Sequence, residues 1–307
     1  MKVQVVNLSP FASLSVNSAK DHVGICHYRF DEGSYRESLL TFNGGNPMEF
    51  KEVVGNRRSI RYFQPWRPVE KEKIHIMLEA ARRASRAVNA PFYRVVVMER
   101  DELTPEQRKG LQTPTTTTDL ELAPLFMFWF IDPTAPNRGP KTLKQLIDVG
   151  ALNASHGWSY AYVDEVVFPH VLQPLMKNEL VAVMFAANEA GFAMTQAMLA
   201  GVDEGLGVCL HAFQPEAVKD VLKAPDYLIP IWVLEVGYPA EDPLTGGQRP
   251  REPLSETCFW GSFDNPIESD PKVVEYLREK KMIQAEAPAP WRMQEVAALS
   301  RMFGLPE

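Results

Sequence analysis

The sequence has little cysteine, and its cysteines are not arranged for a disulfide framework or a zinc site. Only Cys26, Cys209 and Cys258 occur among 307 residues. They lie far apart, without a Cys-x-x-Cys spacing and without a histidine-rich segment nearby. Neither a disulfide-stabilised fold nor a metal site is therefore indicated, and we expect a reducing compartment and no bound metal.

Excess positive charge is also lacking. The 32 basic and 39 acidic residues give a formal net charge of −7, which argues against broad electrostatic binding to nucleic acid or to an anionic membrane. No uncharged apolar run approaches the roughly 18 residues that a bilayer span needs, and residues 1–20 lack the pattern of a secretion signal. We expect a cytoplasmic protein with no nucleic-acid or membrane partner.

The composition is otherwise that of a folded protein, with hydrophobic residues at 45% and charged residues at 23%, which excludes a largely disordered chain. Turn residues and pattern changes divide it into an N-terminal arm (1–47), a main domain (48–260) and a C-terminal helical extension (261–307). Within the main domain we expect a long irregular insertion or lid at about 133–177, because loops of this length are usually functional.

Hydrophobic patterning locates the main elements. It predicts a helix after Pro68, strands at 93–98, 125–131 and 228–236, a helix from Glu179 to about Gly201, and helices near 271–280 and 291–303. Pro230 suits an edge strand or the start of a strand. The helix from Glu179 is apolar over most of its surface, which predicts burial in a large core or at a subunit interface. A homodimer is the economical explanation.

Three arginines and a serine lie within five residues: Arg57, Arg58, Ser59 and Arg61. Guanidinium groups at this density suit bidentate capture of phosphate, although a solvated basic face is the ordinary alternative. The segment reads Arg-Arg-Ser-Ile-Arg-Tyr-Phe and is followed by an alanine-rich helix end, an asparagine and a Val-Val-Val strand. Further along are Glu-Gly-Leu-Gly-Val-Cys, Val-Gly-Tyr-Pro-Ala-Glu and finally Arg-Pro-Arg-Glu-Pro-Leu.

In this order the blocks resemble the nitroreductase superfamily over roughly 50–260. The resemblance implies an α+β fold with a mixed central sheet flanked by helices, and an intertwined homodimer with FMN at its interface. It also implies that NADH or NADPH reduces FMN in a ping-pong cycle and that a small planar substrate, such as a nitroaromatic or quinone, is the acceptor. Since no Gly-x-Gly-x-x-Gly fingerprint occurs, the nicotinamide would share the flavin pocket.

The resemblance also assigns residues to the cofactor. The expected FMN ligands are Arg57, Arg58, Ser59, Arg61, Asn89, Arg249 and Arg251, with the backbone of Cys209, Leu210, His211 and Ala212 beside flavin N5. The glycines common beside N5 are replaced here by His211 and Ala212. The chemistry at that face of the flavin is therefore the part most open to change.

Several side chains have both a chemical and a structural interpretation. His211 could donate a proton to a substrate or polarise a substrate oxygen, or it could be a satisfied structural group. Cys209 lacks a partnered histidine motif, which favours packing over a nucleophilic role. The aromatic residues Trp158, Tyr160 and Tyr162 could stack over a planar substrate or pack with one another.

Other functions on the same fold remain open. They are a flavin-dependent dehydrogenase or oxidase, a reductive dehalogenase, a flavin-fragmenting enzyme, and a non-enzymatic flavin-binding or storage protein. The insertion at 133–177 and the reducibility of the flavin by a nicotinamide would separate these alternatives.

Overall fold

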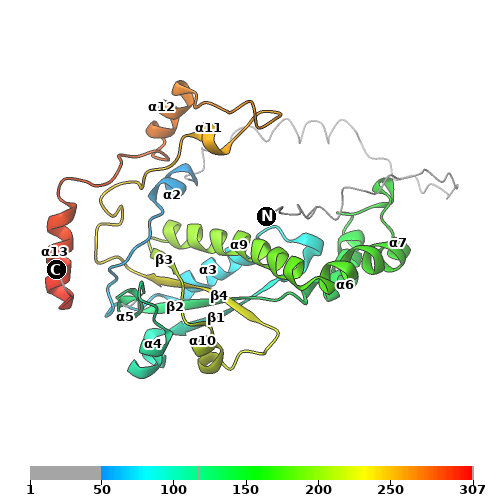
Figure 1. Cartoon of the computed structure of the whole chain (residues 1–307), viewed down its shortest axis with the longest axis horizontal. Helices are drawn as coiled ribbons and strands as arrows, with labels where there is room; N and C mark the ends of the chain where they lie inside the picture. Colours follow the sequence, from blue (N-terminus) through cyan, green and yellow to red (C-terminus); the bar gives the residue numbers. More distant parts are fainter. Residues whose placement is uncertain (1–49, 117, 306–307) are drawn as a thin grey trace, which may run out of the picture. The chain divides into compact units, whose positions relative to one another are not determined.

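An antiparallel sheet lies at the centre of the computed structural model, which describes residues 50–116 and 118–305 (Figure 1). Among these residues the strand order is β1 (Tyr93–Glu99), β2 (Leu125–Ile131), β4 (Ile229–Gly237) and β3 (Gly207–His211). The predicted N-terminal arm, 1–47, lies outside the described residues. β3 forms one edge of the sheet, and Cys209 on β3 pairs with Glu235 on β4.

The helices before the insertion are α2 (Phe50–Asn56), α3 (Lys71–Arg82), η1 (Ala87–Asn89), η2 (Arg100–Glu102), α4 (Pro105–Leu111) and α5 (Asp119–Leu122). The insertion contains η3 (Ala135–Arg138), α6 (Gly139–Asp148), η4 (Ala154–His156), α7 (Tyr160–Tyr162), the π-helical η5 (Val163–Leu172) and α8 (Gln173–Lys177). The remaining helices are α9 (Glu179–Asp203), α10 (Pro215–Leu222), α11 (Leu254–Thr257), α12 (Pro271–Glu279) and α13 (Arg292–Phe303).

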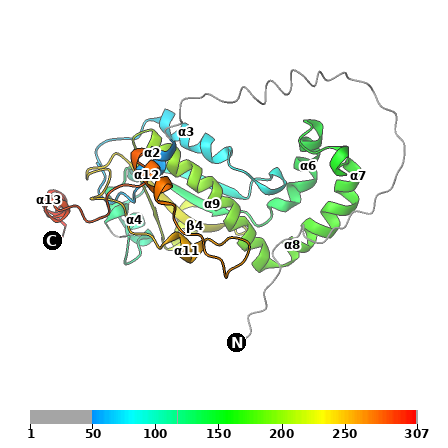
Figure 2. The ribbon, with the colours of Figure 1, turned by 90° about the horizontal axis from the view of Figure 1, so that it is seen from above.

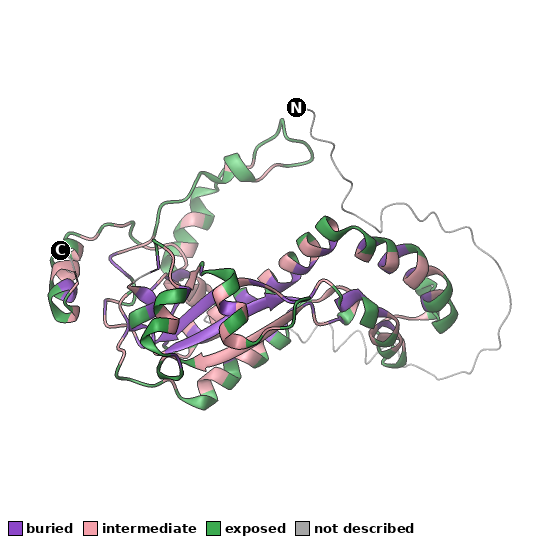
Figure 3. Cartoon of the chain, turned by 60° about the horizontal axis from the view of Figure 1, so that its bottom comes forward, coloured by how far each residue is buried: buried purple, intermediate pink, exposed green. Residues whose placement is uncertain are grey.

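Helices cover both faces of the sheet, which explains why every residue of β2 is apolar and buried (Figure 3). Alternate side chains of a strand point to opposite faces. Phe126 and Phe128 join a core with Leu111 of α4 and Val218 of α10. The alternate residues, such as Met127, pack in a second core with α3 and α9. Cys209 of β3 and Val233 of β4 join the first core on the face of α4 and α10.

Most elements agree with the prediction from sequence. The strands β1, β2 and β4 and the helices α9, α12 and α13 confirm the expected segments within a few residues. Pro230 does not mark an edge, because β4 lies between β2 and β3. It is the second residue of β4, where the pairing with β2 shifts register between Trp129 and Phe130. The alternative that it lies at a strand start is confirmed.

The segment 133–177 is mostly helical, so the prediction of an irregular stretch was wrong. Its helices are short, and three of them carry a proline in the first turn, Pro136 in η3, Pro140 in α6 and Pro174 in α8. Val163, Val167 and Val171 recur every four residues in η5 and form a small separate core. Interruption by proline concealed this spacing in the sequence. The role of the segment as a lid stays a prediction.

The long helix α9 has two distinct faces. Its buried face consists largely of alanines and packs on the sheet and on α3. On the opposite face Leu180, Met184 and Phe192 are 67%, 46% and 47% exposed. Large apolar side chains gathered on one helix face are typical of an interaction surface. Within the described residues, no helix combines the length and apolarity that a membrane crossing requires.

Candidate functional site

The arginine-rich segment runs along the free edge of β3. Ser59 forms a parallel bridge with Val208, and the amide of Ile60 donates to the Val208 carbonyl at 3.0 Å. Gly207 is required here, because a Cβ atom would lie 2.8 Å from the Ile60 side chain. The backbone of the arginine-rich segment is thus fixed against the sheet.

Arg58 is buried, and its guanidinium nitrogens donate hydrogen bonds to other residues of the protein. Its Nε donates to the carbonyls of Leu244 and Gly247 at 3.1 and 3.2 Å, and Nη1 donates to Gly55 O at 2.5 Å. Nη2 donates to Gln284 Oε1 at 2.8 Å. These contacts tie several chain segments together, and a role of Arg58 as a cofactor ligand stays a prediction.

Arginines from two distant parts of the chain converge at this edge. Burial and the neighbouring Arg251 guanidinium lower the pKa of Arg57. Burial, followed by the charges of Arg57 and Arg249, lowers the pKa of Arg58. Within the described residues the Arg57 side chain has no hydrogen bond or ion pair. The side chain of Arg249 hydrogen-bonds there only to Thr245, and that of Arg251 only to the Pro250 carbonyl. The cluster therefore retains capacity to bind an anion.

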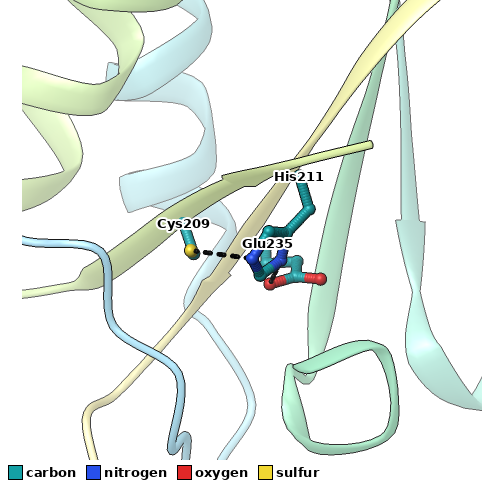
Figure 4. Close-up of side chains that lie close together, drawn as sticks. All are labelled: Cys209, His211 and Glu235. Carbon is teal, nitrogen blue, oxygen red and sulfur yellow. Dashed lines mark hydrogen bonds and ion pairs between the residues drawn. The ribbon is translucent and has the colours of Figure 1, made fainter. Parts of the chain in front are cut away.

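A second cluster consists of the side chains of Cys209 and His211 on β3 and of Glu235 on β4 (Figure 4). His211 Nδ1 lies 2.9 Å from Glu235 Oε2, and Cys209 Sγ lies 3.6 Å from His211 Nε2. Asp119, the first residue of α5, places Oδ2 3.2 Å from the same Nε2. Each His211 nitrogen thus faces a carboxylate.

The electrostatics of this cluster favour a charged imidazole. Burial raises the pKa of Glu235 to about 7 and that of Asp119 to about 6. Burial acts to lower the pKa of His211, but hydrogen bonds to Cys209 and Glu235, with their charges, outweigh it and raise the pKa to about 10. His211 is then an imidazolium at neutral pH, which donates from both nitrogens. Donation of a proton to a substrate would need one of these contacts to break.

Cys209, His211 and Glu235 also offer sulfur, nitrogen and oxygen ligands within 4.8 Å of one another. Zinc–ligand bonds of about 2.0–2.3 Å place neighbouring ligand atoms about 3.3 Å or more apart. The 2.9 Å separation of His211 Nδ1 and Glu235 Oε2 is shorter and is that of a hydrogen bond. The arrangement suits a shared proton better than a metal ion.

The other predicted site residues are spread over the chain. Asn89 ends η1 with a left-handed φ of 53° and is exposed. The rings of Trp158 and Tyr162 lie edge to face at 5.5 Å and pack against the small core of the insertion, and the Tyr160 hydroxyl donates to Asp148. Contacts among these aromatics agree with the packing interpretation, and substrate binding stays a prediction.

A single subunit keeps these aromatics away from the arginines. The aromatics belong to the insertion, which joins the N-terminal end of α9 through α8, whereas Arg57 adjoins β3, which follows the C-terminal end of α9. The 25 residues of α9 span about 37 Å at 1.5 Å per residue. Figures 1 and 2 show α7 and α2 at opposite ends of this helix.

Sequence reasoning missed the two carboxylates around His211. Glu235 carries the one charge in an otherwise apolar strand, Ile-Pro-Ile-Trp-Val-Leu-Glu-Val-Gly, and a charged residue in a buried strand needs a partner. That signal could have identified it. Asp119 ends a threonine-rich run and gave no comparable signal. Cys209 does have a histidine neighbour, because His211 follows two residues later on the same face of β3, but its burial in the first core agrees with the packing interpretation.

A family model described as the nitroreductase family matches residues 54–238. This chain belongs to the nitroreductase family. The match covers the arginine-rich segment, the sheet and α9, and it ends before Arg249. The nitroreductase-like α+β fold predicted from the sequence is thereby confirmed, although the four described strands pair antiparallel where a mixed sheet was expected.

Solved structures share the fold at low sequence identity. A nitroreductase-family protein from Streptococcus pneumoniae TIGR4 superposes with a TM-score of 0.54 and 22% identity, covering 68% of this chain and 98% of that one. A protein from Exiguobacterium sibiricum, solved in complex with FMN, gives 0.56 and 19%, covering 70% and 99%. A Staphylococcus epidermidis protein, whose name proposes an NAD(P)H:FMN oxidoreductase, gives 0.56 and 15%, covering 71% and 98%. No curated protein matches the chain.

Proposed function

We propose that this nitroreductase-family chain is an FMN-dependent oxidoreductase that takes electrons from NADH or NADPH and passes them to a small planar acceptor. Family membership supports a flavin oxidoreductase in general. One observation supports the proposal that the cofactor is FMN. Arg57 and Arg251 lie close together at the free edge of β3, and neither side chain has a carboxylate partner among the described residues.

The residues of this edge fit the phosphate of FMN. A phosphate dianion needs several charge-assisted donors, and guanidinium groups supply them in pairs. Arg57, Arg249 and Arg251 would hold the phosphate, and Ser59 and Arg61 would contact the ribityl chain and the pyrimidine edge. Asn89 would hydrogen-bond the isoalloxazine. Bound FMN would supply hydride transfer at N5.

The chain's own groups would hold and orient the cofactor and the substrate. The backbone from Cys209 to Ala212 would lie beside the flavin ring, and the His211 imidazolium fixes β3 to β4 and α5 under it. Since one subunit separates its aromatic segment from its arginines, Trp158, Tyr160 and Tyr162 would meet the flavin only from the second subunit of a homodimer. The exposed apolar face of α9 is the surface proposed for that dimer.

The test begins with an absorption spectrum of the purified protein, followed by anaerobic addition of NADH and then NADPH. A yellow protein that bleaches, and regains colour with a quinone or nitroaromatic, is the expected result. An Arg57→Met variant should bind the flavin more weakly, while Arg82→Met, which changes an exposed arginine of α3, should bind it as the wild type does. A colourless protein that refuses added FMN would overturn the proposal. A yellow protein that does not bleach would point to storage or to another electron donor.

A further inference from the structure

Residues 281–303 lie outside the part of the chain that matches the family model, yet they contact both arginine-bearing segments of the proposed FMN site. We propose that these residues, the C-terminal brace, act as a positioning element that holds the two segments together and thereby sets the affinity for FMN. The inference rests on the proposed function, and it concerns a part of the chain to which that function assigns no role.

The first contact of the brace is Gln284, whose side chain bridges to the arginine-rich segment. Its Oε1 accepts from Arg58 Nη2 at 2.8 Å, and its Nε2 donates to Asn56 Oδ1 at 2.7 Å. The packing is close enough to exclude any side chain at Gly55, where a Cβ atom would lie 1.9 Å from the carbonyl oxygen of Lys281. Gln284 therefore holds Arg58, the residue next to Arg57.

The brace also holds the segment that carries the second pair of arginines. Gln248, immediately before Arg249, accepts from the Gln284 amide at 2.9 Å and donates to the Met282 carbonyl at 2.8 Å. Its backbone pairs in parallel with Glu286. One stretch of brace thus bonds to both segments through Gln284.

A second, independent contact lies further along the brace. Arg292 forms a salt bridge with Glu241, whose side chain is fully buried. The other oxygen of Glu241 accepts the amides of Arg61 and Tyr62 at 2.6 and 3.1 Å. Removal of the Arg292 charge would leave a buried carboxylate unpaired. The backbone position of Arg61 therefore depends on the brace.

The brace would oppose the repulsion between the arginines of the two segments. Besides burial, the charge of Arg251 lowers the pKa of Arg57, and the charges of Arg249 and Arg251 lower that of Arg58, which means that like charges are held close together before any anion arrives. Repulsion favours separation of the segments, and contacts that prevent it preorganise the site for a phosphate. The brace supplies such contacts from outside the cluster.

The test uses Gln284→Leu and Arg292→Met in the full-length chain, because both keep most of the side-chain volume and remove the polar contact. Met293→Ala is the matched control, since Met293 neighbours Arg292 and is 75% exposed. We expect the dissociation constant for FMN, measured by flavin fluorescence, to rise at least tenfold in the first two variants and to stay unchanged in the control. Arg292→Lys should restore part of the affinity. Turnover at saturating FMN should approach that of the wild type, since the proposed function places no brace residue beside the flavin ring.

Amide hydrogen exchange distinguishes failure of the brace from failure of the proposed function. If the wild type binds no FMN, the proposed function is wrong, and the brace is judged by exchange at Arg61 and Tyr62. Faster exchange at these amides in Arg292→Met, with unchanged exchange in β2, supports the brace. Unchanged affinity together with unchanged exchange in the two folded variants would overturn it.

Discussion

His211 Nδ1 lies 2.9 Å from Oε2 of Glu235, a carboxylate with no exposed surface at the centre of the sheet. Burial of a carboxylate is costly unless a partner supplies the opposite charge. The imidazolium of His211 does so for Glu235 and, through its other nitrogen, for Asp119. The sheet edge that would face the flavin is therefore held by an ion-paired cluster rather than by apolar contacts alone.

Replacing His211 should therefore destabilise the protein strongly. In His211→Leu both carboxylates lose their nearest counter-charge, and we expect the free energy of unfolding at pH 7 to fall by about 3–5 kcal/mol. Urea denaturation of the variant and the wild type measures this difference. His75→Gln, an exposed histidine of α3, should unfold as the wild type does. A His211→Leu protein of wild-type stability would show that the ion pairs contribute nothing.

Asp119 makes the stability depend on pH. Burial raises its pKa from 3.8 to about 6, so between these values the folded state binds more protons than the unfolded state and is destabilised as pH rises. Asp119→Asn removes this dependence. The stability of the wild type relative to the variant should fall with rising pH by at most about 1.4 kcal/mol per pH unit, which amounts to about 2 kcal/mol between pH 4 and 6.

Chemical denaturation at half-unit pH steps from 4 to 7 measures this slope. Asp264→Asn, at an exposed aspartate, controls for the loss of one carboxylate and should leave the wild-type slope intact. Parallel curves for the wild type and Asp119→Asn would contradict the raised pKa of Asp119.

The sequence predicted the elements whose structure depends on residues close together in the chain. It missed those that depend on contacts between distant residues. The strand β2 was predicted to the residue, because Pro124 and Pro133 bound an apolar run that is buried on both faces. The insertion was not, since its helical spacing is carried by short segments around Pro140 and Pro174 whose apolar residues form a small separate core.

The same distinction applies to the site. Arg57 could be found from a local motif and its resemblance to a family. Asp119 could not, because it lies far from His211 in sequence and meets it only in the folded chain. Arg58 and Gln284 are 226 residues apart in sequence, and no local pattern joins them. Contacts of this kind are specified by the whole fold and become visible only in three dimensions.

Although Arg57 and Arg58 are neighbours, we expect their substitution to affect different properties, the affinity for FMN at Arg57 and the stability of the fold at Arg58. Arg57→Met should raise the dissociation constant for FMN about 10- to 100-fold, because a charge-assisted phosphate contact is lost, and should leave the unfolding midpoint nearly unchanged. Arg58→Met should lower the unfolding midpoint, because its buried hydrogen bonds hold Leu244, Gly247 and Gln284. Flavin titration and thermal unfolding of both variants make the comparison. Equal effects of the two substitutions on both readouts would contradict the assignment.

The exposed apolar face of α9 should decide the oligomeric state. Phe192→Glu places a charge among side chains that a second subunit would bury, and burial of an unpaired charge is strongly unfavourable. We expect the variant to be monomeric by light scattering at concentrations at which the wild type is dimeric, and to lose FMN if the cofactor lies at the interface. Val149→Glu, at the exposed end of α6 and 76% exposed, should remain dimeric. A Phe192→Glu dimer that retains flavin would exclude α9 as the dimer surface and would leave the wild-type partner of this face to be sought elsewhere.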